Sequence, residues 1–579
     1  MAIIRTYAEV LALDPTDAET KLIAACKAGE WCTLGDGSCP TERDPDRTIR
    51  SEILRYLLLG GCEACVVDGR GTRLIGGAIA GTLDISYATA HGATRLENCR
   101  FEARFDCVQT KFAMVSLNGS DLKGWRAQTS YVEGSVFLRS ITSSQPIDLN
   151  GSNINGQLSF NGAQIHCQSA YAILAPDACI NGAVFFHPRT QIEKENIDKP
   201  FHATGEIRLN GATIGGLYAQ QSTFVATSTG QSLSLGGATV NGAVRLDGCN
   251  STGELLLAGS RISGRLTCER IKLRNDTGHA FNGQAMRVEH SFVWKKVEHT
   301  SGAISLNGAH VAELDDDPKN WPDGDALFLD GFTYDRIKGT VSTSLARMDW
   351  LKSGSYFGPE FRPQPYSQYA KFLRDTGHDE DARRVLYTRE RLRRDSTRAQ
   401  LSASGHSLAM PINLWSRFWD TMLRFVVGYG HYPFRSVAAL AVLILCTIIP
   451  AHFAWEEGSF APNAAPVLVS DGWKDIAAME PKPAAVWSGD ELPTGSTLTP
   501  EAWKAAAPGR DWETFNRYAY GFDVVIPIID FGQTDAWAPS TTRQDWGWHL
   551  WWARWVLSVM GWIVTALGAA AITGIIRRE

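Results

Sequence analysis

Four cysteines near the N-terminus have side chains that can bind a metal or carry out redox chemistry. Cys62 and Cys65 form a Cys-x-x-Cys pair, and Cys32 and Cys39 lie upstream of it. Four thiolates can hold a structural Zn²⁺, although the Cys32–Cys39 spacing is wider than is usual in such sites. A redox dithiol is a second alternative, but no βαβ pattern surrounds the pair. No cofactor is predicted: we interpret Cys62 and Cys65 as a pair of structural cysteines at a helix end, with zinc as the alternative.

Other chemistry-bearing residues do not fit known site patterns. The acidic run that begins at Asp315-Asp-Asp317 and includes Asp323, Asp325 and Asp330 lacks the glycine and later glutamate of an EF-hand, so we interpret it as an acidic insertion loop. His279, His290 and His299 are irregularly spaced, which favours structural or exposed histidines. The sequence contains no nucleophile elbow, zinc-protease motif or phosphate-binding loop. No catalytic residue is therefore predicted.

Composition excludes several classes of protein. The 579 residues have a net charge of −6, and residues 66–340 hold 25 basic and 27 acidic residues, too balanced for a nucleic-acid track. The 12 cysteines are irregularly spaced and none follows Cys446, which indicates reduced thiols rather than a disulfide framework. Fourteen of the 19 tryptophans lie from Trp415 onward, so the two halves are expected to face different solvents. No signal peptide is recognised at the N-terminus.

Two apolar stretches are long enough to cross a bilayer. Residues 437–454 hold 18 consecutive residues without Asp, Glu, Lys or Arg, and residues 555–576 hold 22. At about 1.5 Å per residue the shorter stretch covers about 27 Å of a bilayer core about 30 Å thick. We predict two transmembrane helices; a buried hairpin in a soluble protein is the alternative.

Charge bias orients the two predicted spans. Residues 371–435 hold 12 basic and 7 acidic residues, whereas residues 455–548, between the spans, hold 6 basic and 14 acidic residues. Arg577 and Arg578 follow the second span. Because Lys and Arg near span ends stay in the cytoplasm, we expect both termini inside and the intervening loop outside.

A short motif recurs through the first half. The pattern Leu-x-Gly-[Ala/Ser]-x-[Ile/Val]-x-Gly occurs at residues 149–156, 235–242 and 257–264, with a variant at 209–216. Leu235, Leu246 and Leu257 keep a step of 11 residues, which suits a short strand plus a turn. Two such units would make a coil of about 22 residues, and stacked coils would bury one apolar column. We predict a mainly β protein with a right-handed parallel β-helix; a β-sandwich with regular turns is the alternative.

Helical segments flank the predicted β-helix. A capping box at residues 16–19 opens a helix that ends near Gly29, and a second helix is predicted over residues 47–59. Residues 365–376 and 379–402 form a basic helical connector. The predicted organisation is an N-terminal helical cap (1–65), a right-handed β-helix (66–340), a helical connector with an interfacial amphipathic helix (341–435), a first transmembrane helix (436–454), an extracytoplasmic Trp- and Pro-rich loop (455–548) and a second transmembrane helix (549–576).

Three groups of residues are candidates for roles in the membrane. Residues 411–427 are amphipathic and suit the inner leaflet, and a tryptophan cluster precedes the second span. Predicted interface residues are Trp415, Arg417, Arg424, Trp551, Trp552 and Arg554, the last snorkelling at the edge of its span. Small residues spaced four apart, Ala566, Ala570 and Gly574, indicate a helix-packing face. Its partner is either the first span of the same chain or the same face of a neighbouring copy, and we favour a homo-oligomer. A re-entrant element, or one packed on the span tops, is predicted around Pro527, Asp530, Gln533 and Trp537.

Several segments together resemble a known group. Residues 428–435 (GYGHYPFR), residues 525–533 (VIPIIDFGQ) followed by Trp537, and residues 561–578 are similar to those of bacterial membrane proteins with a pentapeptide-like β-helix and C-terminal transmembrane helices. Some members carry the label membrane-associated oxidoreductase. The resemblance implies the bacterial inner membrane and no established activity. The label itself is not supported by the residues, because the repeat glycines do not form a dinucleotide motif inside a βαβ unit.

The sequence therefore favours a non-enzymatic, membrane-anchored interaction or sensor protein. We expect its partners to be membrane lipids and a protein that binds the β-helix surface, and we expect no nucleic acid. One alternative is an oligomeric channel-like or pore-forming effector gated by the β-helix. The second alternative is a membrane-associated oxidoreductase.

Overall fold

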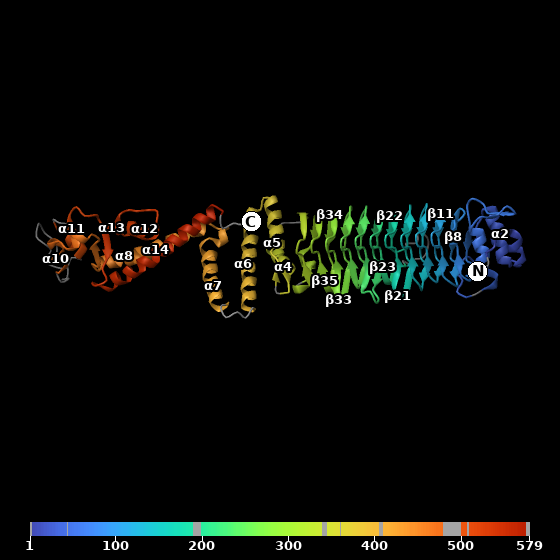
Figure 1. Ribbon diagram of the computed structural model, residues 1–579, viewed down its shortest axis with the longest axis horizontal. Helices are drawn as coiled ribbons and strands as arrows, with labels where there is room; N and C mark the ends of the chain where they lie inside the picture. The colour runs from blue at the N-terminus through green and yellow to red at the C-terminus, as the bar shows by residue number, and fades with distance from the viewer. Residues whose placement is uncertain are drawn as a thin grey trace. The chain divides into compact units, whose positions relative to one another are not determined.

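A computed structural model of the chain describes residues 3–42, 44–188, 199–322, 324–338, 344–358, 360–403, 409–478, 499–506 and 509–574 (Figure 1). They fall into two compact units, Met1–Val385 and Leu386–Glu579. The first unit is a parallel β-solenoid with helices at both of its ends, and the second unit is largely helical.

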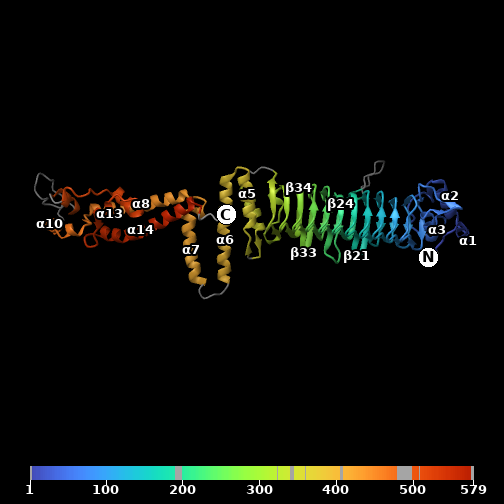
Figure 2. The same ribbon diagram turned by 45° about the horizontal axis from the view of Figure 1, so that its top comes forward.

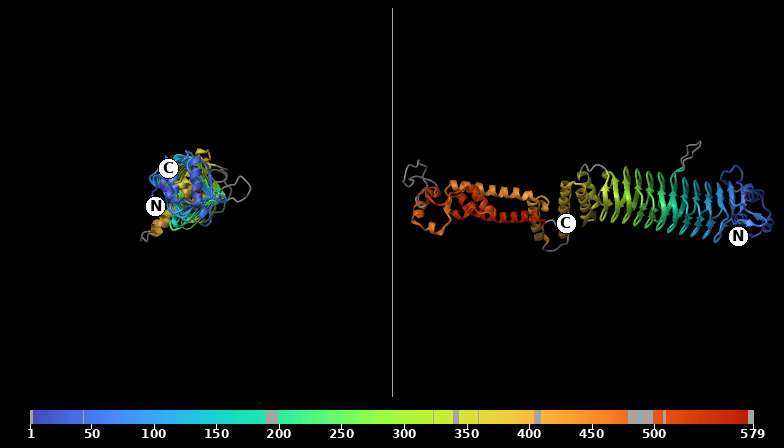
Figure 3. Two further views of the ribbon diagram at one scale, coloured as in Figure 1. Left: turned by 90° about the vertical axis from the view of Figure 1, so that its right-hand side faces the viewer. Right: turned by 90° about the horizontal axis from the view of Figure 1, so that it is seen from above.

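The solenoid has about 11 turns, and its strands line two 18-stranded sheets. The coils are seen edge-on in the right panel of Figure 3. Strand β27 (Thr239–Val240) pairs in parallel with β31 (Arg261–Ile262), and β28 (Val244–Arg245) pairs with β32 (Leu266–Thr267), so equivalent residues are 22 apart. This confirms the coil length expected from the 11-residue step.

Some coils are longer than the repeat. Strands β21 (Gln164–Leu174) and β33 (Lys272–Asn282) each have 11 residues and pair with the next coil through register shifts. The extra residues are accommodated within the strand, while Ile173 and Phe281 still stack on the inward column. The inward positions are therefore kept even where the sequence period is broken.

Side-chain orientation follows the predicted alternation. Leu235, Leu246 and Leu257 are fully buried, whereas Arg245 and Arg261 are exposed. The two glycines of the repeat have different reasons to be glycine. The first, as in Gly237, has a φ of +65°, a left-handed conformation that glycine adopts without strain. The second lies where successive coils nearly touch: a Cβ on Gly182 would stand 2.6 Å from the carbonyl oxygen of Gly156 in the preceding coil.

The N-terminal helices close the first coil. Helix α2 (Asp17–Ala28) begins with the predicted capping box at Thr16 and ends at Gly29 in the left-handed conformation. The predicted second helix is shorter than expected: α3 spans Ser51–Leu58, and the preceding residues form β2 (Thr48–Arg50), which pairs with β6 (Ala78–Ala80). Ile49 lies in β2, which hydrogen-bonds to β6 and so pairs the strand that the first coil would otherwise leave unpaired. Strand β1 (Cys32–Thr33) likewise pairs with β5 (Arg73–Ile75), so the first strands lie within residues 1–65.

The other end is closed by α4 (Ser344–Gly354) and α5 (Gln364–Asp375), the latter seen beside the last strands in Figure 2. The acidic-loop interpretation is wrong for two of its residues. Asp316 ends strand β36 (His310–Asp316), is buried, and accepts hydrogen bonds from Arg347 (2.7 Å) and from the Trp321 indole (2.7 Å). Asp315 pairs with Lys338 at 3.3 Å. Distant basic side chains satisfy these carboxylates, while Asp323 lies outside the described residues.

The second unit contains two long apolar helices, α8 (Phe434–Glu456) and α14 (Asp545–Ile572), which run side by side (Figures 1 and 2). Both are long and apolar enough to cross a membrane, and only 22% of the apolar window of each is buried. A core helix of a soluble protein would be mostly buried, so these exposed apolar surfaces count against the soluble-hairpin alternative. Between them in sequence lie α12 (Arg517–Val525), α13 (Gln533–Ala536) and the antiparallel pair β41 (Phe460–Pro462) and β42 (Trp537–Pro539).

The inward column gives a direct test of the solenoid. Leu235→Ala or Leu257→Ala should each lower the free energy of unfolding by about 2–5 kcal/mol, because a fully buried leucine leaves a cavity. Arg245→Ala and Arg261→Ala, which alter exposed side chains of neighbouring strands, should cost no more than about 0.5 kcal/mol. Denaturant unfolding of the four variants makes the comparison. Equal losses at all four positions would contradict the strand phase.

Candidate functional site

An outward row of aromatic residues crosses consecutive coils of the solenoid. Phe137 of β16 (Val136–Phe137) is in register with Ser159, Ser159 with Phe185 of β22 (Cys179–Phe185), and Phe185 with Tyr218 of β24 (Thr213–Tyr218). The inward neighbours Val136, Val184 and Leu217 are fully buried, so the three rings point away from the core. We call Phe137, Phe185 and Tyr218 the aromatic ladder. Its members are half-buried on an outer face where the fold does not require an aromatic side chain.

Guanidinium groups lie at both ends of the aromatic ladder. Arg139 lies 4.5 Å from the Phe137 ring centroid, and Arg245 lies 5.7 Å from that of Tyr218. The rings of Phe185 and Tyr218 are stacked at 5.3 Å. Aromatic residues and arginine are enriched in protein interfaces, where stacked rings supply rigid contact area at low entropic cost. The arrangement is therefore suited to binding another macromolecule.

The second sheet of the solenoid has a different outer surface. There Asp106 pairs with Arg126 at 3.0 Å and with Arg104 at 2.7 Å, and buried Glu206 pairs with Arg208 at 2.8 Å. The Asp106–Arg126 pair joins neighbouring strands, whereas the other two pairs are local, between residues two apart in the sequence. The aromatic ladder thus distinguishes one face of the solenoid from the other.

The four cysteines predicted as zinc ligands are not gathered in one place. Cys62 and Cys65 face each other in the hairpin of β3 (Gly61–Cys62) and β4 (Cys65–Val66), Cys32 belongs to β1, and Cys39 lies near Asp121. Within the described part of the chain, no three His, Cys, Asp or Glu side chains form a group that could hold a metal ion. Cys32 is buried in its coil.

Two glycines of α14 let neighbouring helices approach it closely, Gly568 toward α8 and Gly561 toward α12. A Cβ on Gly568 would stand 2.8 Å from the Ser436 hydroxyl of α8, and one on Gly561 would collide with the carbonyl of Val525 in α12. The buried face of α14 also contains Val564 and Ala571. Small residues let helix backbones approach within dispersion distance. Gly561 and Gly568, rather than the predicted face, make these contacts.

The predicted helix-packing residues lie elsewhere on the surface. Ala566 is exposed and Ala570 is half-buried. Gly574 follows the end of α14 with a φ of +79°, so it does not continue the helical face. Ala566 and Ala570 are therefore available to a second copy of the chain, and the homo-oligomer stays a prediction.

Helix α12 lies against both apolar helices. Its first residue, Arg517, donates a hydrogen bond to His452 near the end of α8 (2.8 Å). One turn later a Cβ on Gly521 would meet Ile448 at 2.7 Å, and the last residue, Val525, reaches Gly561 of α14. The helix therefore runs from the end of α8 toward the middle of the helix pair. Helix α12 ends before Pro527, so the segment that packs on the two apolar helices precedes the residues around which the re-entrant element was predicted.

The four residues predicted for the re-entrant element have separate positions. Pro527 and Asp530 lie in the turn after α12, beside the exposed apolar side chains of Ile528 and Phe531. Gln533 begins α13 and accepts a hydrogen bond from the amide of Asn516 (2.8 Å). The buried indole of Trp537 donates to the carbonyl of Glu513 (2.9 Å). Gln533 and Trp537 thus hold the segment that follows α12 against the residues just before the start of this helix.

Arg554 lies deeper along α14 than the sequence predicted. Trp546 stacks on Phe453 of α8 at 5.0 Å and so marks the end of the helix pair. At roughly 1.5 Å per residue, Arg554 follows about 12 Å further along the axis, instead of at the edge of the span. Its guanidinium lies 5.2 Å from the Trp555 ring centroid and 5.8 Å from that of Trp551, within electrostatic reach of Tyr520 in α12. Trp551 packs edge-on against Trp552 at 4.9 Å, and Trp552 is exposed.

Helix α7 (Ala409–Val426) carries the three other predicted interface residues. Leu414, Trp415 and Phe418 are exposed on it, and Arg417 is exposed beside them. Arg424 lies 5.8 Å from the ring centroid of exposed Phe425. An apolar surface bordered by arginines is typical of a helix that lies in a membrane interface.

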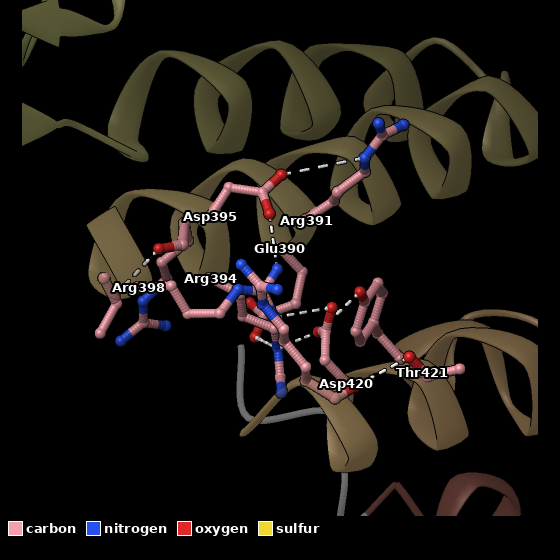
Figure 4. A network of polar contacts seen from close by, with 11 residues as sticks. Glu390, Arg391, Arg394, Asp395, Arg398, Asp420 and Thr421 are labelled. Atoms are coloured by element: carbon pink, nitrogen blue, oxygen red, sulfur yellow. Dashed lines mark hydrogen bonds and ion pairs between the residues drawn. The ribbon is translucent and has the colours of Figure 1, made fainter. Parts of the chain in front are cut away.

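A charged network joins α6 (Asp379–Ala403) to α7 (Figure 4). Asp420, only 9% exposed, pairs with Arg398 at 3.0 Å and accepts a hydrogen bond from the Tyr429 hydroxyl at 2.8 Å. Arg394 lies 3.8 Å from the same carboxylate and pairs with Glu390 at 3.0 Å. Since a nearly buried carboxylate requires partners, this network fixes α7 against α6. It also explains the left-handed Tyr429 (φ +56°), whose hydroxyl is directed at Asp420.

Sequence reasoning missed the aromatic ladder and the glycine contacts. Phe137, Phe185 and Tyr218 are separated by unequal distances in the sequence, because the intervening coils differ in length. In the sequence, these aromatic residues could be recognised only because each one directly follows an inward apolar residue of a strand. Comparisons with protein families, with curated proteins and with solved structures gave no match.

Proposed function

We propose that this chain is a membrane-anchored interaction protein whose solenoid binds a protein partner through the aromatic ladder. The observation that carries the proposal is the alignment of Phe137, Phe185 and Tyr218 in one outward register, with the Ser159 coil between the first two and with Arg139 and Arg245 over the end rings. Outward, half-buried rings bordered by arginine favour a partner segment that presents aromatic or apolar groups with carboxylates beside them.

The helical unit would provide the membrane anchor. In this proposal α8 and α14 cross the bacterial inner membrane, both termini and the solenoid are cytoplasmic, and α7 lies on the inner leaflet. The excess of basic residues before α8 and of acidic residues between the two helices supports this orientation. The apolar face of α7 and its arginines supply the contact with anionic lipid.

Substitution within the aromatic ladder tests the binding surface. A photoreactive residue at Tyr131, which is exposed on the same sheet, would capture the partner in living cells. The double variant Phe185→Thr/Tyr218→Thr should lower the captured yield by at least about tenfold, since central aromatic contacts dominate interface energies.

The matched control changes outward residues of the same two strands. Cys179→Ser/Thr213→Ser leaves the aromatic ladder intact and should capture the partner at the wild-type yield. Equal capture by the ladder variant and the control, with both folded, would show that the aromatic ladder is not the binding surface.

Thiol labelling tests the orientation. In a Cys446→Ala background, Thr541→Cys places a thiol at an exposed position between the two apolar helices. A membrane-impermeant maleimide should label this variant in intact cells, because the loop is expected outside. The parent protein, whose remaining cysteines precede α8, should react only after the cells are permeabilised. Labelling of the parent in intact cells, without labelling at position 541, would reverse the orientation.

A second candidate, an oligomeric channel-like protein, is favoured by α12 and Arg554. A helix that reaches the middle of a pair of spans, beside a half-buried cation, resembles the arrangement from which pores are built. Two spans cannot enclose a pore, so several copies would be needed. If the candidate is correct, purified protein in a planar bilayer should conduct anions, and Arg554→Gln should reduce their selectivity.

The control for the conductance measurement is in the same helix. Gly561→Val should displace α12 and alter the conductance, whereas Val556→Ile, at an exposed position, should not. Absence of conductance from the wild-type protein would leave the anchored interaction protein as the function.

A further inference from the structure

The hairpin after α3 holds two cysteines in direct opposition. Cys62 of β3 and Cys65 of β4 are register partners in an antiparallel pair, and only Glu63 and Ala64 connect them. Gly61 has a φ of +73°, and a Cβ there would collide with the carbonyl of Cys65. The glycine therefore permits a tight hairpin that holds the two thiols next to each other.

The two thiols have different surroundings. Cys62 is partly exposed, and its sulfur accepts a hydrogen bond from the Tyr56 hydroxyl at 3.1 Å. Tyr56 is 3% exposed and belongs to α3, so its hydroxyl is held in place by the helix. Cys65 is fully buried behind Cys62. A reagent from solution can thus reach Cys62 first.

The electrostatics assign different roles to the pair. The Tyr56 hydrogen bond, helped by backbone amides that include that of Ala64, holds the pKa of Cys62 below its usual value. Burial raises the pKa of Cys65 and also that of Tyr56, which keeps the phenol protonated as a donor. Because the thiolate is the nucleophile, Cys62 is the more reactive thiol at neutral pH and Cys65 stays a thiol.

Other cysteines in the N-terminal region lack these features. Burial raises the pKa of Cys26 to about 12 and that of Cys32 to about 11. Cys39 is partly exposed as Cys62 is, yet burial raises the pKa of its thiol. Cys39 is therefore a natural internal reference for reactivity.

We propose that Cys62 and Cys65 form a redox-active dithiol, with Cys62 as the attacking thiol and Cys65 as the resolving thiol, which a hydroperoxide oxidises to a disulfide. The Cys62 thiolate attacks the terminal oxygen of the hydroperoxide, the O–O bond breaks, and the alkoxide or hydroxide leaves with a proton from water. The resulting sulfenic acid is attacked by the Cys65 sulfur, which gives up its proton as water departs. Two electrons pass from the dithiol to the peroxide, and an external dithiol would return them.

The site is independent of the aromatic ladder and of the membrane anchor. It differs from the zinc site considered from the sequence, since two thiols suffice and Cys32 and Cys39 take no part. A low-pKa, accessible cysteine next to a resolving cysteine is the arrangement found in redox-sensing proteins. The Tyr56 hydrogen bond supplies the activation that a surrounding βαβ fold would otherwise provide.

The test compares thiol reactivity in the full-length protein in detergent. Iodoacetamide at neutral pH should modify Cys62 about tenfold faster than Cys39, as expected when the thiolate fraction is higher. Treatment with hydrogen peroxide should remove two hydrogen atoms from the tryptic peptide of residues 56–70. In Cys65→Ala, dimedone should instead trap a sulfenic acid at Cys62, because the resolving thiol is missing.

The variant Tyr56→Phe tests whether the reactivity of Cys62 depends on the Tyr56 hydrogen bond or only on the exposure of the Cys62 thiol. This variant keeps the ring but removes the donor, so alkylation of Cys62 should slow by about threefold or more, with a shift to higher pH. The rate at Cys39 should not change, which also reports that the N-terminal region is folded. Equal alkylation rates at Cys62 and Cys39 in the wild type, or a peroxide-treated peptide that keeps both thiols, would overturn the proposal.

Discussion

The solenoid depends on one constraint, the backbone hydrogen bonding of each coil to the coils before and after it. Parallel strands joined in this way are held at about 4.8 Å, so equivalent residues must stack whatever their side chains. Inward positions therefore build one continuous apolar column that includes Leu235 and Leu257. Where coils approach most closely, as at Gly156 and Gly182, only glycine fits. The literal repetition of the glycine motif follows from this stacking.

Stacking also leaves groups without partners at the two ends of the solenoid, and other parts of the first unit cover them. The end coils expose unpaired strands and apolar side chains, which α2, α3, α4 and α5 cover. Side chains on the outer surface, by contrast, are free of the constraint. One sheet uses that freedom for ion pairs such as Asp106–Arg126, and the other for the aromatic ladder. The outward aromatic row contributes nothing to the inward column, so the packing of the column does not account for its aromatic side chains.

Close backbone approach governs the helical unit as well. Gly561 brings α12 against α14, and Gly568 brings α14 against α8. These contacts leave apolar side chains such as Val442 and Val559 on the outside, where lipid would solvate them. The half-buried Arg554 lies on the same helix, with its guanidinium near the rings of Trp551 and Trp555. A cation in that position has an energetic cost, which is why it draws attention as a functional group.

The amino-acid sequence alone determined the features that depend on local period and composition. The 11-residue step and the glycine motif predicted the solenoid, its 22-residue coil and the inward leucines, and uninterrupted apolar stretches predicted α8 and α14. Only the tertiary structure decided which distant residues meet. Coils of unequal length align Phe137, Phe185 and Tyr218, Arg347 reaches Asp316, and the Tyr56 hydroxyl of α3 meets Cys62. A repeat fixes neighbours one coil away, but register across insertions and the packing of helices depend on the summed contacts of the whole chain, which no local pattern encodes.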